Sequence, residues 1–156
     1  MKKRIFYIVV PISVFLIGFI TLDILLGSLY SPNVRHYRKP HDYYHHDLVP
    51  NVSNVYSKWA NQIYKISTNS LGFRDSLSRN ISNHSDKYRI ILIGDSFTEA
   101  VGVDWNDSFA GILFNRLENR GIEILNAGVI GYSPRIYYLK TDHLLNIRKL
   151  RFDELI

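Results

Sequence analysis

The stretch RIILIGDSFTEAVGV, Arg89 to Val103, decides the fold of this 156-residue chain. Its first half, Ile90–Ile93, is a continuous run of β-branched residues and leucine, which is typical of a strand buried on both faces of a parallel sheet. Gly94, Asp95 and Ser96 then end the run with residue types that favour a turn. The sequence therefore predicts a buried strand and a sharp turn, and it leaves open whether Ser96 serves the turn or a reaction.

Helices and strands alternate downstream of this turn. Asn106–Gly121 is predicted to be a helix, capped by Asn106 or Asp107 and ended by Gly121. Ile122–Leu125 predicts a second buried strand, a second helix begins with Pro134 after Ser133, and a third strand begins in the last six residues. The apolar positions of the first helix fall on one stripe: Phe109, Ile112, Leu113 and Leu117. This strand–helix order predicts right-handed crossovers and a parallel sheet.

The net charge of +5 belongs to the N-terminal arm. Residues 1–40 hold six of the 19 basic residues and one of the 14 acidic ones, which leaves 13 of each for the rest of the chain. A neutral body lacks the basic face that phosphate binding needs, so nucleic acid is not an expected partner. The chain has no cysteine, which excludes disulfides, thiol nucleophiles and thiolate metal sites.

An uncharged run of 18 residues, Ile5–Leu22, follows the basic residues 2–4. As a helix it would be about 27 Å long, close to the bilayer hydrocarbon thickness of about 30 Å. We predict that residues 5–30 anchor the chain in the lipid bilayer as a single pass, with Asp23 near the far interface. The basic tip predicts a cytoplasmic N-terminus and an extracytoplasmic body. The alternative is a cleaved signal peptide, but its apolar core usually runs about 7–15 residues before a small-x-small site, and no such site follows here.

Residues 31–86 are predicted to form an irregular juxtamembrane segment between the anchor, residues 1–30, and a domain at residues 87–156. The segment shows no sustained period of 2 or 3.6, and its only predicted strand is Tyr64–Thr68. Four of its residues could be considered as metal ligands: His41, His45, His46 and Asp47. Helical support is weak there and no zinc-helix motif surrounds them, so neither a metal nor a cofactor is expected.

The motifs at the two predicted strand ends resemble a known family. GDSFTEA follows the first strand and NAGVIGYS, Asn126–Ser133, follows the second, and loops of this kind meet at the carboxyl edge of a parallel sheet. Together they resemble the SGNH/GDSL hydrolases, and TNSLGFRDS with the anchor resembles the membrane-tethered bacterial branch. Over residues 68–156 the resemblance implies a flavodoxin-like three-layer α/β/α fold. It also implies action on acyl esters, those of cell-surface glycans in this branch.

The resemblance assigns roles to three residues. Ser96 matches the family nucleophile, which attacks an ester carbonyl to give an acyl-enzyme. The backbone N–H groups of Ser96 and Gly131 match two donors of the oxyanion hole, and Asp95 would brace the turn. Ala100 departs from the family's usual glycine at the end of the first motif.

Two further family blocks do not occur in these 156 residues. The family places a third oxyanion donor, an Asn, after the third strand and an Asp-x-x-His base near its C-terminus. We therefore expect a fold truncated after about the third parallel strand, without Ser96-dependent turnover. Asp42 and His45 have the Asp-x-x-His spacing, but they precede the serine, and one such pattern is unremarkable by chance. His143 is expected to pack on its helix face.

Three functions stay open at this point. The first is a membrane-anchored serine ester hydrolase or O-acyl transferase that uses Ser96 on an acyl-ester or glycan substrate. The second is a truncated, catalytically incompetent member of the family that serves only as an anchor or binding module. The third is a non-enzymatic flavodoxin-like binding module, although GDSFTEA lacks a glycine-rich phosphate cradle.

Overall fold

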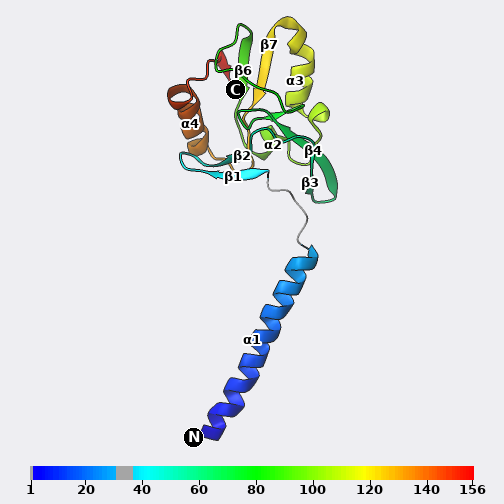
Figure 1. Cartoon of the computed structure of the whole chain (residues 1–156), viewed down its shortest axis with the longest axis vertical. Coiled ribbons are helices and arrows are strands. Elements are labelled where there is room, and N and C mark those ends of the chain that lie inside the picture. Colours follow the sequence, from blue (N-terminus) through cyan, green and yellow to red (C-terminus); the bar gives the residue numbers. More distant parts are fainter. Residues whose placement is uncertain (1, 31–36) are drawn as a thin grey trace. The chain divides into compact units, whose positions relative to one another are not determined.

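The computed structural model describes residues 2–30 and 37–156, and the chain divides into two compact units. The first unit, Met1–Val34, contains one long helix, α1 (Lys2–Tyr30). The second unit, Arg35–Ile156, is a mixed α/β body (Figure 1). Each unit has its own internal contacts and is described separately.

Helix α1 is apolar and exposed. Its window Val9–Leu26 has a mean hydropathy of 2.5, and 0% of this window is buried inside the protein. A core helix of this composition would be covered by other elements, whereas a bilayer can cover an exposed one. The hydroxyl of Thr21 donates to the carbonyl of Ile17 at 2.7 Å, which satisfies that polar group within the helix. By length and composition, α1 can cross a membrane, as the sequence predicts.

The body is built on a mixed sheet of six strands in the order β3-β4-β5-β7-β6-β8. Its parallel part consists of β6 (Tyr88–Leu92), flanked by β7 (Ile122–Asn126) and β8 (Glu154–Leu155). These strands lie where the sequence predicts two buried strands and the start of a third, and β8, the third, is exposed. The finding is a mixed sheet rather than a wholly parallel one, because three further strands extend it.

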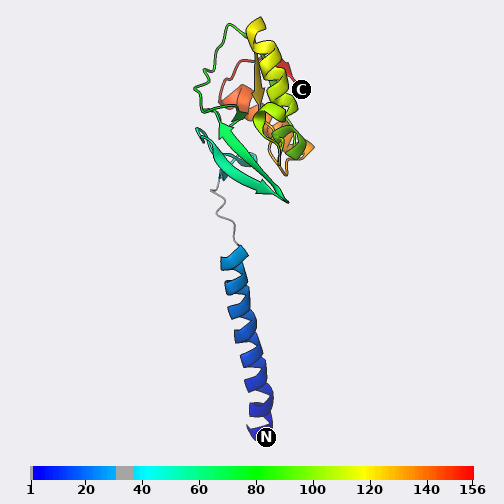
Figure 2. The ribbon, with the colours of Figure 1, turned by 90° about the vertical axis from the view of Figure 1, so that its right-hand side faces the viewer.

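The antiparallel half of the sheet comes from residues that were predicted to be irregular. β3 (Val55–Trp59) and β4 (Gln62–Thr68) form a hairpin, and β5 (Arg74–Asp75) joins β4 to β7 (Figure 2). The prediction was wrong here because β3 exposes most of its side chains and β5 has only two residues, so neither shows an apolar alternation. Only β4 had been predicted in part.

A second hairpin precedes the sheet. β1 (Arg38–His41) and β2 (His45–Leu48) pair antiparallel in a separate two-stranded sheet. Polar and aromatic side chains dominate this hairpin, so its strands lack the apolar alternation by which a strand is predicted from sequence. The prediction of an irregular segment was therefore wrong for residues 38–75. It holds for residues 76–86, which contain no helix or strand, and residues 31–36 lie outside the described part of the chain.

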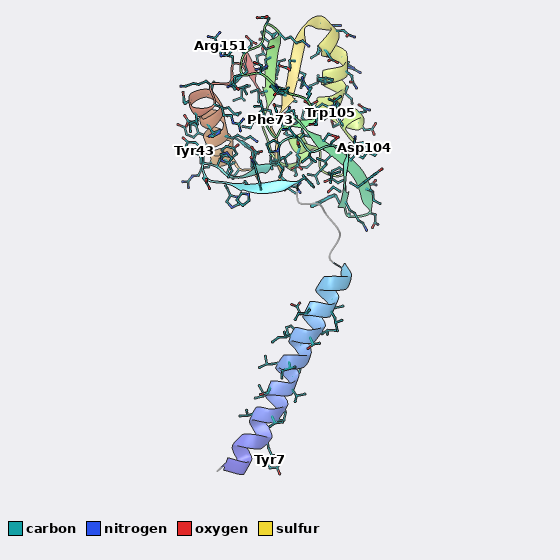
Figure 3. The ribbon with its side chains drawn as sticks, viewed as in Figure 1. Tyr7, Tyr43, Phe73, Asp104, Trp105 and Arg151 are labelled. Atoms are coloured by element: carbon teal, nitrogen blue, oxygen red, sulfur yellow. The ribbon has the colours of Figure 1, made fainter. Side chains whose placement is uncertain are left out.

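Helix α3 (Phe109–Leu117) covers one face of the parallel strands. Its buried residues Ala110 and Phe114 pack in one cluster with Ile124 of β7, beside the ring of Trp105 (Figure 3). The helix cap is the Oγ of Ser108, which accepts the N–H of Gly111 at 3.0 Å. The predicted caps, Asn106 and Asp107, belong instead to the 3₁₀ turn η1 (Trp105–Asp107), and the predicted stripe residues Phe109 and Ile112 are exposed.

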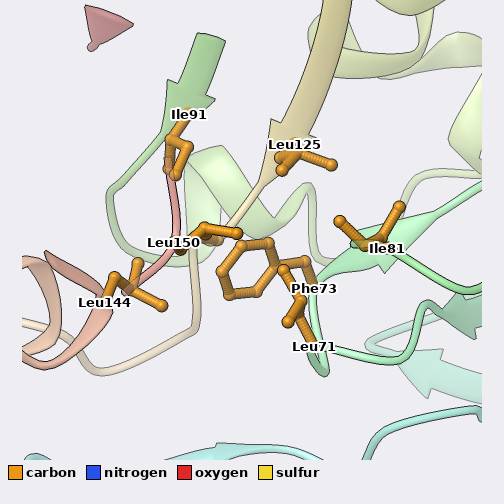
Figure 4. Close-up of a cluster of buried hydrophobic side chains, with 8 residues drawn as sticks. Leu71, Phe73, Ile81, Ile91, Leu125, Leu144 and Leu150 are labelled. Atoms are coloured by element: carbon orange, nitrogen blue, oxygen red, sulfur yellow. The ribbon is translucent and has the colours of Figure 1, made fainter. Parts of the chain in front are cut away.

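Helix α4 (Pro134–Asp142) and the following π-helix η3 (His143–Ile147) belong to the opposite face. Leu125 of β7 and Leu144 of η3 lie there in a buried cluster around Phe73 (Figure 4). The neighbouring residue Ile124 belongs to the cluster on the α3 side, so both faces of β7 are buried, as predicted for this strand. The other members of the cluster are Leu71, Ile81, Ile91, Ala127 and Leu150.

The fully buried side chain of α4 is a cation. Lys140 Nζ donates to Asp47 Oδ1 at 2.9 Å and to the carbonyl of Ala127 at 3.0 Å. The hydroxyl of Tyr44 donates to the second carboxylate oxygen of Asp47 at 2.6 Å. Burial lowers the pKa of the Lys140 ammonium, and the negative charge of Asp47 opposes that shift. The pair thus ties the β1–β2 hairpin to α4 through two buried charges that need each other and their hydrogen bonds for compensation.

Replacing Lys140 with Met should be strongly destabilising, because it leaves the Asp47 carboxylate buried without its cation. We expect the free energy of unfolding of the full chain in detergent to fall by about 3–5 kcal/mol, measured by denaturant titration with tryptophan fluorescence. Lys58→Met, at an exposed position, is the matched control and should change it by less than about 0.5 kcal/mol. Equal stability of the two variants would contradict a paired Lys140.

Candidate active site

Ser96 is the first residue of a one-turn helix, α2 (Ser96–Glu99), that begins just beyond the end of β6. The carboxylate of Asp95 accepts the N–H of Phe97 at 3.0 Å, which is the bracing contact predicted for Asp95. Ser96 is partly exposed. Within residues 2–30 and 37–156, neither its hydroxyl nor its N–H has a hydrogen-bond partner. The serine is therefore accessible and its backbone N–H is available as a donor.

The loop after β7 packs against the loop that carries Ser96. The N–H of Val129 donates to the carbonyl of Gly94 at 3.0 Å, and Asn126 Nδ2 donates to the carbonyl of Thr98 at 2.6 Å. A Cβ at Gly128 would lie 2.5 Å from the side chain of Thr98, so only glycine permits this approach. The two motif loops are therefore in direct contact, as their order in the sequence predicts.

Gly131 lies farther along the second loop, at a φ of +82°. A side chain there would be strained by the backbone conformation, although not by crowding, since a Cβ would lie 3.7 Å from the nearest atom of His46. In the described part of the chain its N–H has no acceptor. Among the described residues, neither the N–H of Ser96 nor that of Gly131, the two donors that the family resemblance implies for an oxyanion hole, has an acceptor.

A buried carboxylate with no role in the sequence analysis joins the two loops. Glu99, the last residue of α2, is fully buried. Its Oε2 accepts the N–H of Ile130 at 2.6 Å, and its Oε1 accepts from Arg38 of β1 at 2.5 Å. The residue stood in the quoted motif, but neither partner could be inferred, because both lie far away in the sequence.

Ala100 takes the left-handed conformation, with φ 60° and ψ 52°, at the position where the resembled family has glycine. A residue with a Cβ pays about 1–2 kcal/mol for this conformation. Arg74 of β5 compensates by donating to the carbonyls of Glu99, Ala100 and Val103. Burial lowers the pKa of the Arg74 guanidinium, while the nearby charge of Glu99 raises it. The departure from glycine is therefore accommodated by a buried arginine.

The β1–β2 hairpin contacts the second loop through His46. Its Nε2 lies 2.7 Å from the carbonyl oxygen of Ile130, and the hydroxyl of Tyr132 donates to the backbone carbonyl of His46 at 2.7 Å. The ring of Tyr132 also meets the imidazole edge-on, with centroids 5.0 Å apart. The sequence analysis placed His46 in an irregular segment and gave it no part in the site.

The structure does not pair Asp42 with His45. Instead, Nδ1 of His45 lies 2.7 Å from Nδ1 of His46, and the backbone of His45 has a strained φ of 84°. Among the hydrogen bonds of residues 37–156, none joins a histidine or a carboxylate to the hydroxyl of Ser96. In the same residues, no group of three or more His, Asp or Glu side chains could hold a metal ion.

His143 packs against the hairpin, as expected for a packing role. Its ring meets that of His41 edge-on, with centroids 4.9 Å apart, and His41 is stacked on Tyr44 at 3.7 Å. Tyr43 extends the contact by donating to the carboxylate of Asp142 on α4 (Figure 3). Burial lowers the pKa of both His41 and His143. This cluster packs the β1–β2 hairpin against α4 and η3.

Comparisons with known proteins identify no family for this chain. No protein-family model matches the chain, and no curated protein matches its sequence. The resemblance to the SGNH/GDSL hydrolases therefore rests on the motifs.

Acidification should destabilise the body through the two packed histidines. Because the pKa of each is lowered below the ordinary 6.5, the unfolded chain binds more protons than the folded one as the pH falls. The stabilisation that the two neutral histidines contribute to the fold is therefore complete above about pH 6.5 and is lost progressively below it. We expect the thermal midpoint, followed by circular dichroism, to fall between pH 7.5 and 5.5.

His143→Phe should make this fall shallower, whereas His84→Phe, at an exposed loop position, should leave it unchanged. A pH dependence that is the same in wild type and in His143→Phe would show that the cluster does not titrate with folding.

Proposed function

We propose that this chain is a membrane-anchored serine ester hydrolase or O-acyl transferase of the SGNH/GDSL type, with Ser96 as the nucleophile. The observation that carries the proposal is a pair of N–H groups, of Ser96 and Gly131, that have no acceptor among the described residues and lie on contacting loops beyond the carboxyl ends of parallel strands. Acyl transfer needs such donors where negative charge develops. A three-layer α/β/α arrangement is supported by α3 and α4 on opposite faces of these strands (Figure 1).

The chemistry would proceed in two acyl transfers. The hydroxyl oxygen of Ser96 attacks the ester carbonyl, its proton passes to a base, and the N–H groups of Ser96 and Gly131 bind the resulting oxyanion. Collapse expels the alcohol, which takes up a proton, and leaves the acyl-serine. Water or a sugar hydroxyl then receives the acyl group and restores Ser96. Among the described residues no base contacts the hydroxyl of Ser96, so this step requires a base from another source.

Acyl esters of cell-surface glycans are the proposed substrates. The basic tip and apolar α1 support a single pass with the N-terminus in the cytoplasm, which would place the body on the side where such glycans lie. Phe97, the neighbour of Ser96, is 85% exposed and offers an apolar surface to an acyl chain or a sugar face.

Catalysis should depend on Ser96 and on a base that the contacts among the described residues do not bring to its hydroxyl. A serine hydroxyl without a base is a poor nucleophile, and loss of serine or histidine from such a triad costs about 10⁶ in rate. We expect no Ser96-dependent turnover of an aryl acetate by the 156-residue chain in detergent. A chain extended through any in-frame downstream Asn and Asp-x-x-His blocks should show turnover that Ser96→Ala abolishes.

Three outcomes would change this assignment. Turnover by the extended chain that survives Ser96→Ala would remove the nucleophile from the proposal. Turnover by the 156-residue chain that both Ser96→Ala and His45→Ala abolish would place the base in the hairpin. Inactivity at every length would favour the alternative function, a catalytically incompetent anchor or binding module, which the lack of a base contact within the described residues supports.

The anchor predicts firm membrane association. The exposed apolar surface of α1 should keep the full chain in the membrane pellet through alkaline carbonate extraction, which releases peripheral proteins. A variant lacking residues 5–30 should appear in the supernatant. Release of the full chain under the same treatment would rule out a membrane-spanning α1.

A further inference from the structure

The peptide unit between Ile130 and Gly131 is held at its carbonyl by the hairpin. Its oxygen belongs to Ile130 and lies 2.7 Å from Nε2 of His46, whereas its N–H belongs to Gly131 and has no acceptor among residues 37–156. The preceding N–H, that of Ile130, is bound by the buried carboxylate of Glu99 at 2.6 Å. Both polar backbone groups of Ile130 are therefore occupied, and the adjoining N–H of Gly131 is the one left available.

The hydrogen bonds define which ring nitrogens of His45 and His46 act as donors. A carbonyl oxygen can only accept, so Nε2 of His46 must carry the proton that it donates to Ile130. In a neutral His46 imidazole, Nδ1 is then an acceptor, and Nδ1 of His45 is the donor to it. The contact with Tyr132 fixes the ring of His46 from another side.

Peptide geometry transmits this hydrogen bond to Gly131. The peptide is planar and trans, so its C=O and N–H point in opposite directions. Fixing the carbonyl direction with His46 therefore fixes the direction of the Gly131 N–H. A donor on the carbonyl also polarises the amide, which strengthens its N–H as a donor in turn.

We propose that His46 is a positioning residue for the oxyanion hole, one that directs the N–H of Gly131 and strengthens it as a donor by binding the Ile130 carbonyl. The proposal rests on the function proposed for Ser96 and deepens it. It makes the β1–β2 hairpin, which lies outside the two motifs, a working part of the site. His46 itself touches no reacting atom and acts only through the peptide.

The first test is spectroscopic and does not require activity. In the ¹⁵N-labelled full chain in detergent micelles, His46→Ala should move the amide resonance of Gly131 more than His84→Ala does. His46→Gln should restore most of the wild-type position, because the glutamine side chain also ends in an N–H donor. Ser96→Ala should leave the effect of His46 unchanged. If the Gly131 amide resonance does not move in His46→Ala, the proposal is overturned.

The second test uses the chain length that shows Ser96-dependent turnover of an aryl acetate. There, His46→Ala should lower kcat by about 10–100-fold with little change in KM, because a misdirected donor is lost mainly in the transition state. His46→Gln should recover most of that loss. Equal kcat in His46→Ala and wild type would overturn the proposal. Failure of every chain length to turn over would instead count against Ser96 as nucleophile, and the Gly131 resonance would still decide the role of His46.

Discussion

The candidate site depends on one buried carboxylate. Glu99 is fully buried, so its charge must be compensated by hydrogen bonds and an opposite charge inside the protein. Arg38 of β1 and the N–H of Ile130 provide that compensation from two segments far away in sequence. Because Glu99 ends the same helical turn that begins with Ser96, its bonds set the serine, the second loop and the hairpin in one arrangement.

Further buried polar groups extend the same constraint. Lys140 and Asp47 hold β2 against α4, and Arg74 holds the carbonyls around Ala100. Replacing such groups with well-packed apolar residues often costs no stability, but an unpartnered member is expensive. Few alternative packings can therefore satisfy all of them at once. A defined arrangement of this kind is what acyl transfer needs, because its donors must point at one developing charge.

The sequence predicted the parts of the molecule that have a local signal. Ile90–Ile93 is a continuous apolar run and Ile122–Leu125 is apolar apart from Glu123, because both faces of their strands are covered, and the motif glycines mark the loops that follow. The hairpins and β5 left little such signal, since most of their strands are short and exposed or polar, and β5 has only two residues and pairs with the distant strand β7. For the same reason Ser96 could be proposed from its motif, whereas the contact of His46 exists only after the hairpin has docked.

Residue-by-residue amide hydrogen exchange in the intact chain, at Ile130 and Gly131, tests this account most directly. The N–H of Ile130 is bound at 2.6 Å by a buried carboxylate, whereas the N–H of Gly131 has no acceptor among the described residues. The account predicts slow exchange at Ile130 and fast exchange at Gly131. Fast exchange at both positions would contradict it, because the Glu99 carboxylate would then not hold the second loop.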